Sequence, residues 1–502
     1  MTVIQRFDVL PDGLPAECAE IVSARGGRLA TMVALDERRE HNRFRLIYVF
    51  AVSGGWINVE SSLDGTAPRH ASVTPLVPAA YWYEREARDL LGIEPVGHPD
   101  PRRLVHHDDW PDGVYPLRKD FRSTTPIPRI TNQQHQFHHL HGDGIVEIPV
   151  GPIHAGVIEP GHFRFAAVGE RVLHLETRLF YTHRGIEKLA EGKDPHNVLQ
   201  IAERVCGVCA CSHAVSYCQA IEDLTGATVP ARAAAIRSIL LELERLYNHA
   251  GDLGNMCAGT GFAVGAAQGA WLKEQLQRLN ERVSGNRYLR GICRVGGLRR
   301  DLSREMLGDI RRTLADLAGQ FERFVDLFES TESFQERMRR TGVVSREAAT
   351  AMGAVGVAAR AAGVGNDARL DHPHAGYSGV GLPLAIEREG DAGARARVRI
   401  AETRTSLKLV DQLIATLPRG PVLQDVGPLP GHREGLGVTE SPRGENVHWV
   451  RTAANGTIER YRVRSASFCN WPVVAMSVPG NMVPDFPLIN KSFELCYSCL
   501  DR

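Results

Sequence analysis

Long apolar runs and a net charge are both missing from this chain of 502 residues. No segment approaches the roughly 18 consecutive apolar residues that a membrane-spanning helix needs. The start of the chain, residues 1–8, lacks the basic flank and the apolar stretch of a secretory signal. The 59 Lys and Arg residues equal the 59 Asp and Glu residues, so no electrostatic field recruits nucleic acid. We therefore expect a cytoplasmic protein without a nucleic-acid partner.

Cysteine is scarce, with ten residues in the whole chain, and it is unevenly placed. The cysteines cluster instead of spreading as crosslinks, which is typical of a reducing compartment. Two Cys-x-x-Cys pairs stand out, Cys206 with Cys209 and Cys496 with Cys499. Thiolates from two such pairs can converge on one site, and soft sulfur ligands suit zinc, an iron–sulfur cluster, or nickel with iron. The spacing alone leaves these alternatives open.

A ferredoxin-type motif is also missing. Cys211 and Cys218 lie near the first pair. A cluster that used Cys206, Cys209 and Cys211 would need a fourth ligand and lacks the usual ferredoxin spacing. We therefore predict that Cys211 and Cys218 are core thiols or redox-inert thiols.

The residues around both pairs carry a recognisable pattern. Residues 203–209 read Glu-Arg-Val-Cys-Gly-Val-Cys and are followed by Ser212 and His213, while residues 496–502 read Cys-Tyr-Ser-Cys-Leu-Asp-Arg. These motifs resemble the first and second cysteine motifs of the NiFe-hydrogenase large subunit. The residues within these motifs resemble those of the group 4, energy-converting branch. That branch is similar to the quinone-site subunits of respiratory complex I. Further stretches agree in order, at residues 151–165, 440–445 and 462–472.

Residues 1–122 are predicted to form a separate α+β unit. Residues 45–52 are rich in β-formers, and residues 53–55 supply turn chemistry. Residues 56–60 then resume with alternation, so this region is predicted to be a β-hairpin.

A signature follows that hairpin, at residues 81–93, 97–104 and 116–121. It resembles the 30-kDa subunit of complex I, here fused ahead of the large subunit as in formate-hydrogenlyase-type enzymes. The resemblance implies a docking domain without a cofactor. The alternative is that the charged block at residues 84–86 is an ordinary solvated helix face.

Residues 123–148 are rich in proline and polar residues and are predicted to be a linker. Histidine clusters can bind metal, but nothing nearby constrains the geometry of this one. We therefore predict structural or surface use for the linker histidines His135, His138, His139 and His141.

Residues 149–502 are predicted to form a mainly α-helical domain that resembles the NiFe-hydrogenase large subunit and the complex I 49-kDa subunit. Two amphipathic stripes at steps of three and four predict long helices. One begins after Ser303 and comprises Leu307, Ile310, Leu314, Leu317, Phe321, Phe324 and Phe328. The other comprises Ile236, Leu240, Leu243, Leu246 and Tyr247.

The resemblance implies a metal centre of nickel and iron, NiFe(CO)(CN)2, whose carbon monoxide and cyanide ligands come from maturation proteins. In the family, the second cysteine of each pair bridges the two metals and the first binds nickel alone. Carried over to this chain, Cys209 and Cys499 bridge, and Cys206 and Cys496 are terminal. Iron–sulfur clusters are expected in partner subunits and none in this chain.

Splitting dihydrogen into a hydride and a proton needs a metal beside a base. The terminal thiolate of Cys496 is the nearest proton acceptor, and Glu159 matches the family glutamate that passes protons toward solvent. Burial would raise the pKa of such a carboxyl toward neutrality. Arg443 matches the family arginine that helps to polarise bound hydrogen. Outside the motifs, Glu159 would be a turn residue and Arg443 a surface charge.

Other residues are expected in the environment of the cofactor. Ser467 matches a hydrogen-bond donor to a cyanide, and His213 belongs to the first cysteine motif. Glu494 with Leu495 replaces the usual Asp-Pro before the last pair, so the salt bridge to Arg443 is expected to be arranged differently. Asn248 stands where many uptake hydrogenases carry an aspartate, so no carboxylate is assigned there.

The resemblance thus implies the catalytic subunit of a membrane-associated hydrogenase that cleaves or forms H2 reversibly, with evolution as the expected direction. Expected partners are a small subunit with a proximal iron–sulfur cluster, other iron–sulfur subunits, integral membrane antiporter-like subunits and maturation proteins. The chain would sit on the cytoplasmic face of the membrane. Arg502 matches the residue after which family precursors are cut, so the chain is either processed or encoded without a tail.

Rival classes remain open from the sequence. The first is a metal-free, complex I-like quinone or ion-pump module. The second is a zinc-structural subunit, because zinc accepts the same four thiolates. The third is a subunit that binds nickel and iron but serves only in assembly or docking.

Overall fold

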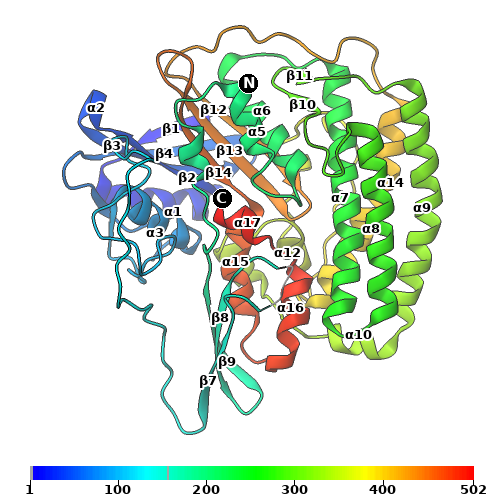
Figure 1. Cartoon of the computed structure of the whole chain (residues 1–502), viewed down its shortest axis with the longest axis horizontal. Helices are drawn as coiled ribbons and strands as arrows, with labels where there is room; N and C mark the ends of the chain where they lie inside the picture. Colours follow the sequence, from blue (N-terminus) through cyan, green and yellow to red (C-terminus); the bar gives the residue numbers. More distant parts are fainter. Residues whose placement is uncertain (1–3, 155–157) are drawn as a thin grey trace.

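The computed structural model describes residues 4–154 and 158–502. Figure 1 shows an α/β unit from the N-terminal residues, a central sheet with short helices around it, and a bundle of long helices on the far side. The predicted fold class, an α+β unit followed by a mainly helical domain, is confirmed. Three residues of the motif at residues 151–165, namely 155–157, lie outside the described residues.

The N-terminal unit is built on a four-stranded sheet in the order β1-β4-β3-β2. β1 (Ile4–Asp8) runs parallel to β4 (Gly55–Asp64), while β3 (Arg43–Val52) is antiparallel to both β4 and β2 (Arg28–Glu37). Gly54, with a φ of 80°, closes the turn between β3 and β4, where Val52 pairs with Gly55. The hairpin predicted from the sequence is confirmed.

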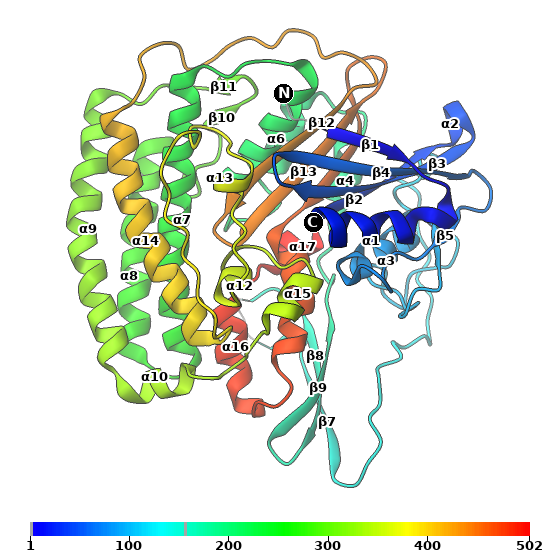
Figure 2. The same ribbon diagram turned by 180° about the vertical axis from the view of Figure 1, so that it is seen from behind.

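Helices α1 (Leu14–Arg25) and α3 (Tyr81–Leu91) pack against this sheet, as Figure 2 shows for α1. The charged residues of α3 are buried. Glu84 accepts hydrogen bonds from the hydroxyls of Tyr48 at 2.9 Å and Ser72 at 2.6 Å, and Glu86 pairs with Arg462 at 2.8 Å. The alternative that this block is a solvated helix face is therefore wrong. Around the sheet lie α2 (Arg38–His41), η1 (Pro11–Gly13), η2 (Pro78–Ala80), and the parallel pair β5 (Arg69–Ala71) and β6 (Glu94–Val96).

Residues 123–144 contain neither helix nor strand and lead into a small antiparallel sheet. Its strands are β7 (Ile145–Val150), β8 (His162–Val168) and β9 (Arg171–Arg178). The predicted linker, residues 123–148, therefore ends inside β7. The loop between β7 and β8 carries Glu159.

The bundle contains α7 (Ala231–Gly259), α8 (Ala263–Ser284), α9 (Arg304–Ser330) and α14 (Ala392–Ala415), which lie side by side. A Cβ added to Gly269 on α8 would lie 2.5 Å from the Cα of Gly254 on α7, so two glycines allow these helices to approach closely. No helix among the described residues is both long enough and apolar enough to cross a membrane.

Both predicted amphipathic helices are confirmed. The Ser303 hydroxyl accepts a hydrogen bond from the N–H of Met306 at 3.1 Å, and α9 begins at the next residue. The α7 stripe is buried throughout, and the α9 stripe is buried from Ile310 onward, at Ile310, Leu314, Leu317, Phe321, Phe324 and Phe328.

The centre of the molecule is the antiparallel sheet β12 (Glu434–Ser441), β13 (Gly444–Thr452) and β14 (Ile458–Arg464). α6 (Ala210–Thr225) packs on β12, and a Cβ added to Gly437 would meet the carbonyl oxygen of Ser216 at 1.9 Å. Only glycine permits this close contact.

The N-terminal unit is packed into the same body as the central sheet. β2 is an edge strand, and arginines of β14 bind its free carbonyls. Arg464 donates to the carbonyl oxygen of Ala30 at 2.6 Å, and Arg460 donates to that of Ala34 at 3.1 Å. An apolar cluster also joins β2 and β3 to β12 and β13. Buried side-chain donors thus cover an edge that would otherwise be open.

Short elements connect these parts. They are α4 (Ile186–Ala190), α5 (Pro195–Ala202), β10 (Cys293–Arg294), β11 (Gly297–Leu298), α10 (Glu332–Met338), α11 (Arg346–Ala351), α12 (Gly356–Ala361), α13 (Ala368–Asp371), α15 (Ala466–Ser477), η3 (Val483–Asp485), α16 (Phe486–Phe493) and α17 (Tyr497–Asp501).

Candidate metal centre

The two Cys-x-x-Cys pairs meet in space although 290 residues separate their corresponding members. The Sγ of Cys206 lies 3.2 Å from the Sγ of Cys496, and the Sγ of Cys209 lies 3.1 Å from the Sγ of Cys499. Cys496 is partly buried and the other three are buried. The structure describes all ten cysteines, and each is a free thiol. Four thiols therefore form one compact cluster in the interior.

Local structure holds the two pairs together. Cys209 is the residue before α6, and Cys496 is the residue before α17, which carries Cys499. The guanidinium of Arg184 donates to the carbonyl oxygen of Val205 at 2.8 Å and to that of Ser498 at 2.7 Å. Since Val205 precedes the first pair and Ser498 lies inside the second, one side chain links both.

The donor set fits a soft metal centre. Hydrogen bonding with the thiols of Cys206 and Cys499 lowers the pKa of Cys209 to about 6, while contact with Cys206 raises the pKa of Cys496 to about 11. The opposite shifts show that these neighbouring thiols differ in how readily they lose a proton. Metal binding would displace the remaining thiol protons, because the thiolate is the ligand. Among the described residues, the side chains able to hold a metal ion together are these four cysteines and His213.

Glu159 lies beside the second pair. Its Oε2 accepts a hydrogen bond from the N–H of Ser498 at 2.6 Å, and the Ser498 hydroxyl lies 3.1 Å from the Sγ of Cys496. Burial and the neighbouring Cys496 raise the pKa of Glu159. A single serine thus separates this carboxyl from the thiol that the sequence indicates as the proton acceptor.

Arg443 is buried in the turn between β12 and β13, and it faces Asp252 on α7. It donates to both carboxylate oxygens of Asp252, with 2.8 Å between Nη2 and Oδ1. Arg399 on α14 donates to the same carboxylate at 3.0 Å. Although burial opposes ionisation, these two guanidiniums hold the pKa of Asp252 well below its usual range. Arg443 is therefore a fixed positive charge with an ionised partner.

Asp252 was missed from the sequence. Asn248, to which the sequence assigned no carboxylate role, donates to the carbonyl oxygen of Val208 at 2.8 Å. Asp252 follows Asn248 by four residues and shares its helix face, a spacing that could have identified it. Glu494 lies at the end of α16, where burial and the Asp252 carboxylate raise its pKa to about 7. Among the described residues, the ion pair of Arg443 is with Asp252.

Ser467 and His213 both contact the second pair. The Ser467 hydroxyl accepts a hydrogen bond from the N–H of Cys496 at 3.1 Å, which leaves its own hydrogen for another acceptor. The Nε2 of His213 lies 3.4 Å from the Sγ of Cys499. Both residues therefore lie next to the sulfur cluster.

The additional thiols are separate from this cluster. Cys211 and Cys218 lie on α6 and are fully buried, so the prediction of core thiols is confirmed. No sequence pattern indicated Glu244 on α7, whose carboxylate accepts hydrogen bonds from the N–H groups of Cys211 at 2.7 Å and Ser212 at 3.0 Å. It thereby satisfies the first turn of α6.

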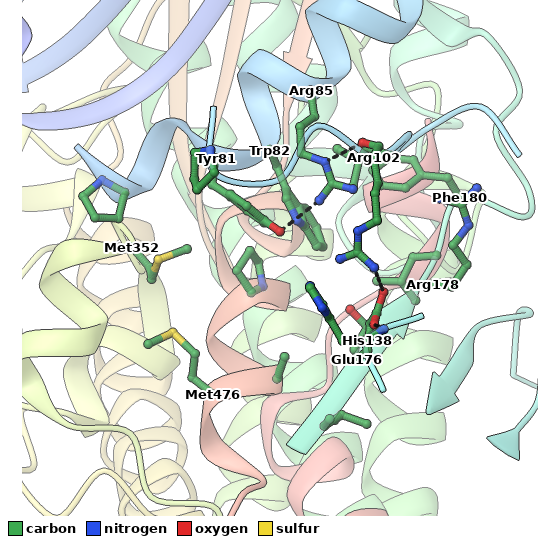
Figure 3. Close-up of a pocket in the computed structure, with 18 of the residues that line it drawn as sticks. Tyr81, Trp82, Arg85, Arg102, His138, Glu176, Arg178, Phe180, Met352 and Met476 are labelled. Carbon is green, nitrogen blue, oxygen red and sulfur yellow. Dashed lines mark hydrogen bonds and ion pairs between the residues drawn. The ribbon is translucent and has the colours of Figure 1, made fainter. Parts of the chain in front are cut away.

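The linker histidines lie away from the cysteines. His135 lies 3.0 Å from Glu176 on β9, and the N–H of His138 donates to the same carboxylate at 2.8 Å. These residues line a cavity of about 490 Å³ between α3, β9 and α15, with no cysteine among its described lining residues. Figure 3 shows Arg102 reaching Glu176 in this cavity, so the carboxylate that the histidines contact already has a guanidinium partner.

Comparison with known proteins identifies the family. Residues 184–251, which include Cys206 and Cys209, match the family described as nickel-dependent hydrogenase. Residues 7–126 match the 30-kDa subunit of respiratory-chain NADH dehydrogenase, and residues 260–429 and 423–502 match its 49-kDa subunit. Formate hydrogenlyase subunit 5 of Escherichia coli (strain K12) is 39% identical over 509 residues, which cover 100% of this chain and 89% of that protein. The chain belongs to this family of hydrogenase large subunits. The resemblance seen in the sequence is confirmed.

The chain is also similar to proteins with other names. The membrane-bound hydrogenase subunit alpha of Pyrococcus furiosus is 34% identical over 71% of this chain and 87% of that protein. An NADH-quinone oxidoreductase protein of Phocaeicola vulgatus is 31% identical over 75% of this chain and 76% of that protein. A chain from a structure of the membrane-bound sulfane sulfur reductase, an archaeal respiratory membrane complex, matches with a TM-score of 0.68 and 26% identity. This match covers 72% of the present chain and 100% of the chain in that structure. The site residues, more than the fold, must therefore decide the function.

Proposed function

We propose that this chain is the catalytic large subunit of an energy-converting NiFe-hydrogenase that forms or cleaves H2. The observation that carries the proposal is the convergence of four thiols from the two pairs, at 3.1–3.2 Å across each contact. A second observation supports it: the ionised pair of Arg443 and Asp252 is buried. Quinone chemistry would have no use for four clustered thiols.

Cys206, Cys209, Cys496 and Cys499 would hold nickel and iron, which supply the Lewis-acid and redox chemistry that dihydrogen requires. The protein's own part is proton transfer and orientation. A proton on the Sγ of Cys496 would pass by way of the Ser498 hydroxyl to Glu159, whose raised pKa lets it hold a proton nearer neutral pH.

Arg443 would supply a fixed positive charge beside the reacting molecule. Its guanidinium is oriented by two hydrogen bonds that Asp252 accepts, so it needs no reorganisation during the reaction. Ser467 would hold the backbone of Cys496 in place and keep a hydroxyl hydrogen for a cyanide on iron.

Electrons would arrive through a small partner subunit with a proximal iron–sulfur cluster, since the described residues of this chain offer one metal-binding group of cysteines. Other iron–sulfur subunits and integral membrane antiporter-like subunits would complete the complex, and maturation proteins would deliver the metals. We place the chain on the cytoplasmic face of the membrane, held by protein contacts. The relative from Pyrococcus furiosus, which is named as membrane-bound, supports the association with a membrane.

A metal-free, complex I-like module is the second candidate, because an NADH-quinone oxidoreductase protein is among the relatives. Metal analysis and infrared spectroscopy of the purified complex discriminate between the two. Nickel and iron together with carbon monoxide and cyanide bands are expected. A metal-free chain would favour the quinone module, and one zinc without nickel would favour a structural subunit.

Replacement of a bridging cysteine tests which residues hold the metals. We expect Cys209→Ser to lose nickel and all H2 evolution, because a hydroxyl is a poor ligand for soft metals. Cys218→Ser is the matched control, since Cys218 lies on the adjoining helix α6 and is equally buried. Its nickel content, measured by elemental analysis, should equal that of the wild type. Equal nickel in both variants would contradict the ligand assignment.

A further inference from the structure

Four buried polar side chains contact one another in a row, which we call the file: Cys499, His213, His448 and Tyr461. The Nε2 of His213 lies 3.4 Å from the Sγ of Cys499, and the Nδ1 of His213 lies 2.8 Å from the Nε2 of His448 on β13. The Nδ1 of His448 lies 2.9 Å from the hydroxyl oxygen of Tyr461 on β14. Cys499 is 1% exposed and the other three are 0% exposed. The four side chains are therefore shielded from bulk solvent.

The hydrogen bond between Tyr461 and His448 has a preferred donor. A phenol has one hydrogen to donate, and a buried donor without a partner costs free energy. Among the described residues, the hydrogen-bond partner of the Tyr461 hydroxyl is the Nδ1 of His448. If Tyr461 accepted from that nitrogen, its own hydrogen would be left without a partner. Tyr461 therefore donates, and the Nδ1 of His448 accepts.

A neutral imidazole carries one N–H, so the rest of the file follows from that first bond. A ring nitrogen that accepts a hydrogen bond carries no hydrogen, so the single N–H of such a ring lies on its other nitrogen. With its Nδ1 used as an acceptor, His448 has its hydrogen on Nε2 and donates to the Nδ1 of His213. His213 in turn has its hydrogen on Nε2, directed at Cys499.

The chemistry of Cys499 requires the same direction of hydrogen-bond donation, independently of Tyr461. As a metal ligand, Cys499 is a thiolate without an S–H and can only accept. A bond from Cys499 to His213 is then impossible, and the file must run from Tyr461 to sulfur. Both ends of the file thus require one set of tautomers.

We propose that His448 and Tyr461 are positioning residues that fix His213 as an N–H donor to the metal-bound thiolate of Cys499. The inference rests on the proposed function only in requiring Cys499 to bind a metal. Hydrogen bonds to a charged acceptor are strong, and a donor behind the imidazole strengthens its N–H further. The file would thus withdraw electron density from this sulfur and fix the orientation of the His213 ring.

The tautomers can be observed directly. In the full chain loaded with zinc alone, which is diamagnetic and makes Cys499 a thiolate, 15N spectra of labelled histidine should show both rings protonated at Nε2. The His448→Gln variant assigns the His448 signal by its loss. Protonation at Nδ1 of either ring would overturn the proposal. This measurement does not depend on which metal the protein binds in the cell.

Variants test the effect on the centre. His448→Leu breaks the file at similar size, whereas His448→Gln keeps one donor and one acceptor. We expect the infrared bands of the iron ligands to move to lower wavenumber in His448→Leu, because the sulfur becomes more electron-rich, and to return toward the wild-type position in His448→Gln. Tyr461→Phe should move them in the same direction by a smaller amount, which keeps the test usable if His448→Leu does not fold.

Tyr217→Phe is the matched control. Tyr217 is also fully buried, its ring lies 5.5 Å from that of Tyr461, and its hydroxyl donates to the carbonyl oxygen of Pro195 outside the file. Its bands should stay at the wild-type position. Unmoved bands in both His448→Leu and Tyr461→Phe, or equal shifts in Tyr217→Phe, would refute the positioning role. A wild-type protein without such bands would refute the hydrogenase proposal instead, and the nitrogen spectra would still decide the tautomers.

Discussion

Under the proposed function, different side chains around the sulfur cluster would hold the metals and move protons. Among the described residues, Glu159 is linked to the cluster by Ser498, whose N–H donates to its Oε2 at 2.6 Å. A carboxyl in this position can exchange protons with sulfur without being a ligand. Arg443 would likewise not be a ligand but a positive charge, oriented by its ion pair with Asp252.

Replacement of Glu159 by Gln tests the proton role. The amide keeps the size of the carboxyl but cannot take up a proton at accessible pH. We expect nickel content and infrared bands to stay at wild-type values, while H2 evolution slows by roughly 10²–10⁴-fold, the usual contribution of a general acid–base group. Gas chromatography of evolved H2 and elemental analysis supply the measurements. Loss of nickel, or full activity, would contradict the assignment.

Residues with motif spacing were predictable, and residues brought in by packing were not. Cys206, Cys209, Cys496 and Cys499 stand in two local motifs, so the sequence indicated them directly. Asp252 lies on an ordinary helix, and His448 and Tyr461 lie on ordinary strands. Their importance comes from contacts with other elements: Arg443 contacts Asp252 at a separation of 191 residues, and His213 contacts His448 at a separation of 235. No local motif specifies these partners.

At the scale of elements, helices were easier to recognise than strands. The apolar residues of α9 recur with the helical period and form one buried face, so the sequence pattern of this helix is strong. Strand β13 is buried along its whole length, from Gly444 to Thr452, and therefore shows no alternation. The central sheet was missed for this reason, although two of the recognised motifs lie on it.

The helices and strands around the bundle share a buried ionic cluster. Arg360 on α12 bonds to Glu402 on α14 at 2.8 Å and to Glu440 on β12 at 2.9 Å. Burial and the neighbouring Asp367 carboxylate raise the pKa of Glu440 to about 7. By contrast, Arg360 and His249 hold the pKa of Glu402 well below its usual range despite burial. One carboxyl of the cluster is thus easily protonated and the other is not.

This difference predicts a pH effect on stability. A carboxyl with a raised folded-state pKa stabilises the fold below its unfolded pKa, near 4.5, and this stabilisation is lost as pH rises through about 7. Glu440→Gln cannot ionise, so the variant does not lose stability in this way. Between about pH 5.5 and pH 8, its free energy of unfolding should therefore rise relative to the wild type by on the order of 1–3 kcal/mol.

Glu402→Gln is the matched control for this measurement. Its carboxylate is already ionised above the unfolded pKa, so the variant should be less stable than the wild type by the same amount at both pH values. Denaturant unfolding followed by circular dichroism measures both differences. A pH-independent difference for Glu440→Gln would show that its carboxyl is ionised throughout.

The whole molecule is joined through a second buried ionic cluster, between the N-terminal unit and the end of the chain. Glu86 on α3 pairs with Arg502 and with Arg462, the latter at 2.8 Å. Glu187 on α4 pairs with Arg502 at 3.0 Å and with Arg460 at 2.8 Å. All these side chains are at most 7% exposed. Since Arg502 directly follows α17, the N-terminal unit is connected to the helix that carries Cys499.

This connection predicts that a change in the N-terminal unit reaches the metal site. Glu86→Gln leaves three buried guanidiniums opposed by Glu187, and breaking a buried pair costs about 3–5 kcal/mol. We expect a lower thermal midpoint and a reduced nickel content, because α17 loses an anchor. Glu84→Gln is the control on the same helix. Glu84 is also buried, but among the described residues its hydrogen bonds lie within the N-terminal unit, to residues that include Tyr48, Ser72 and Val73. It should lower the midpoint yet keep its nickel, and equal nickel in both variants would show that the two units are stable independently of one another.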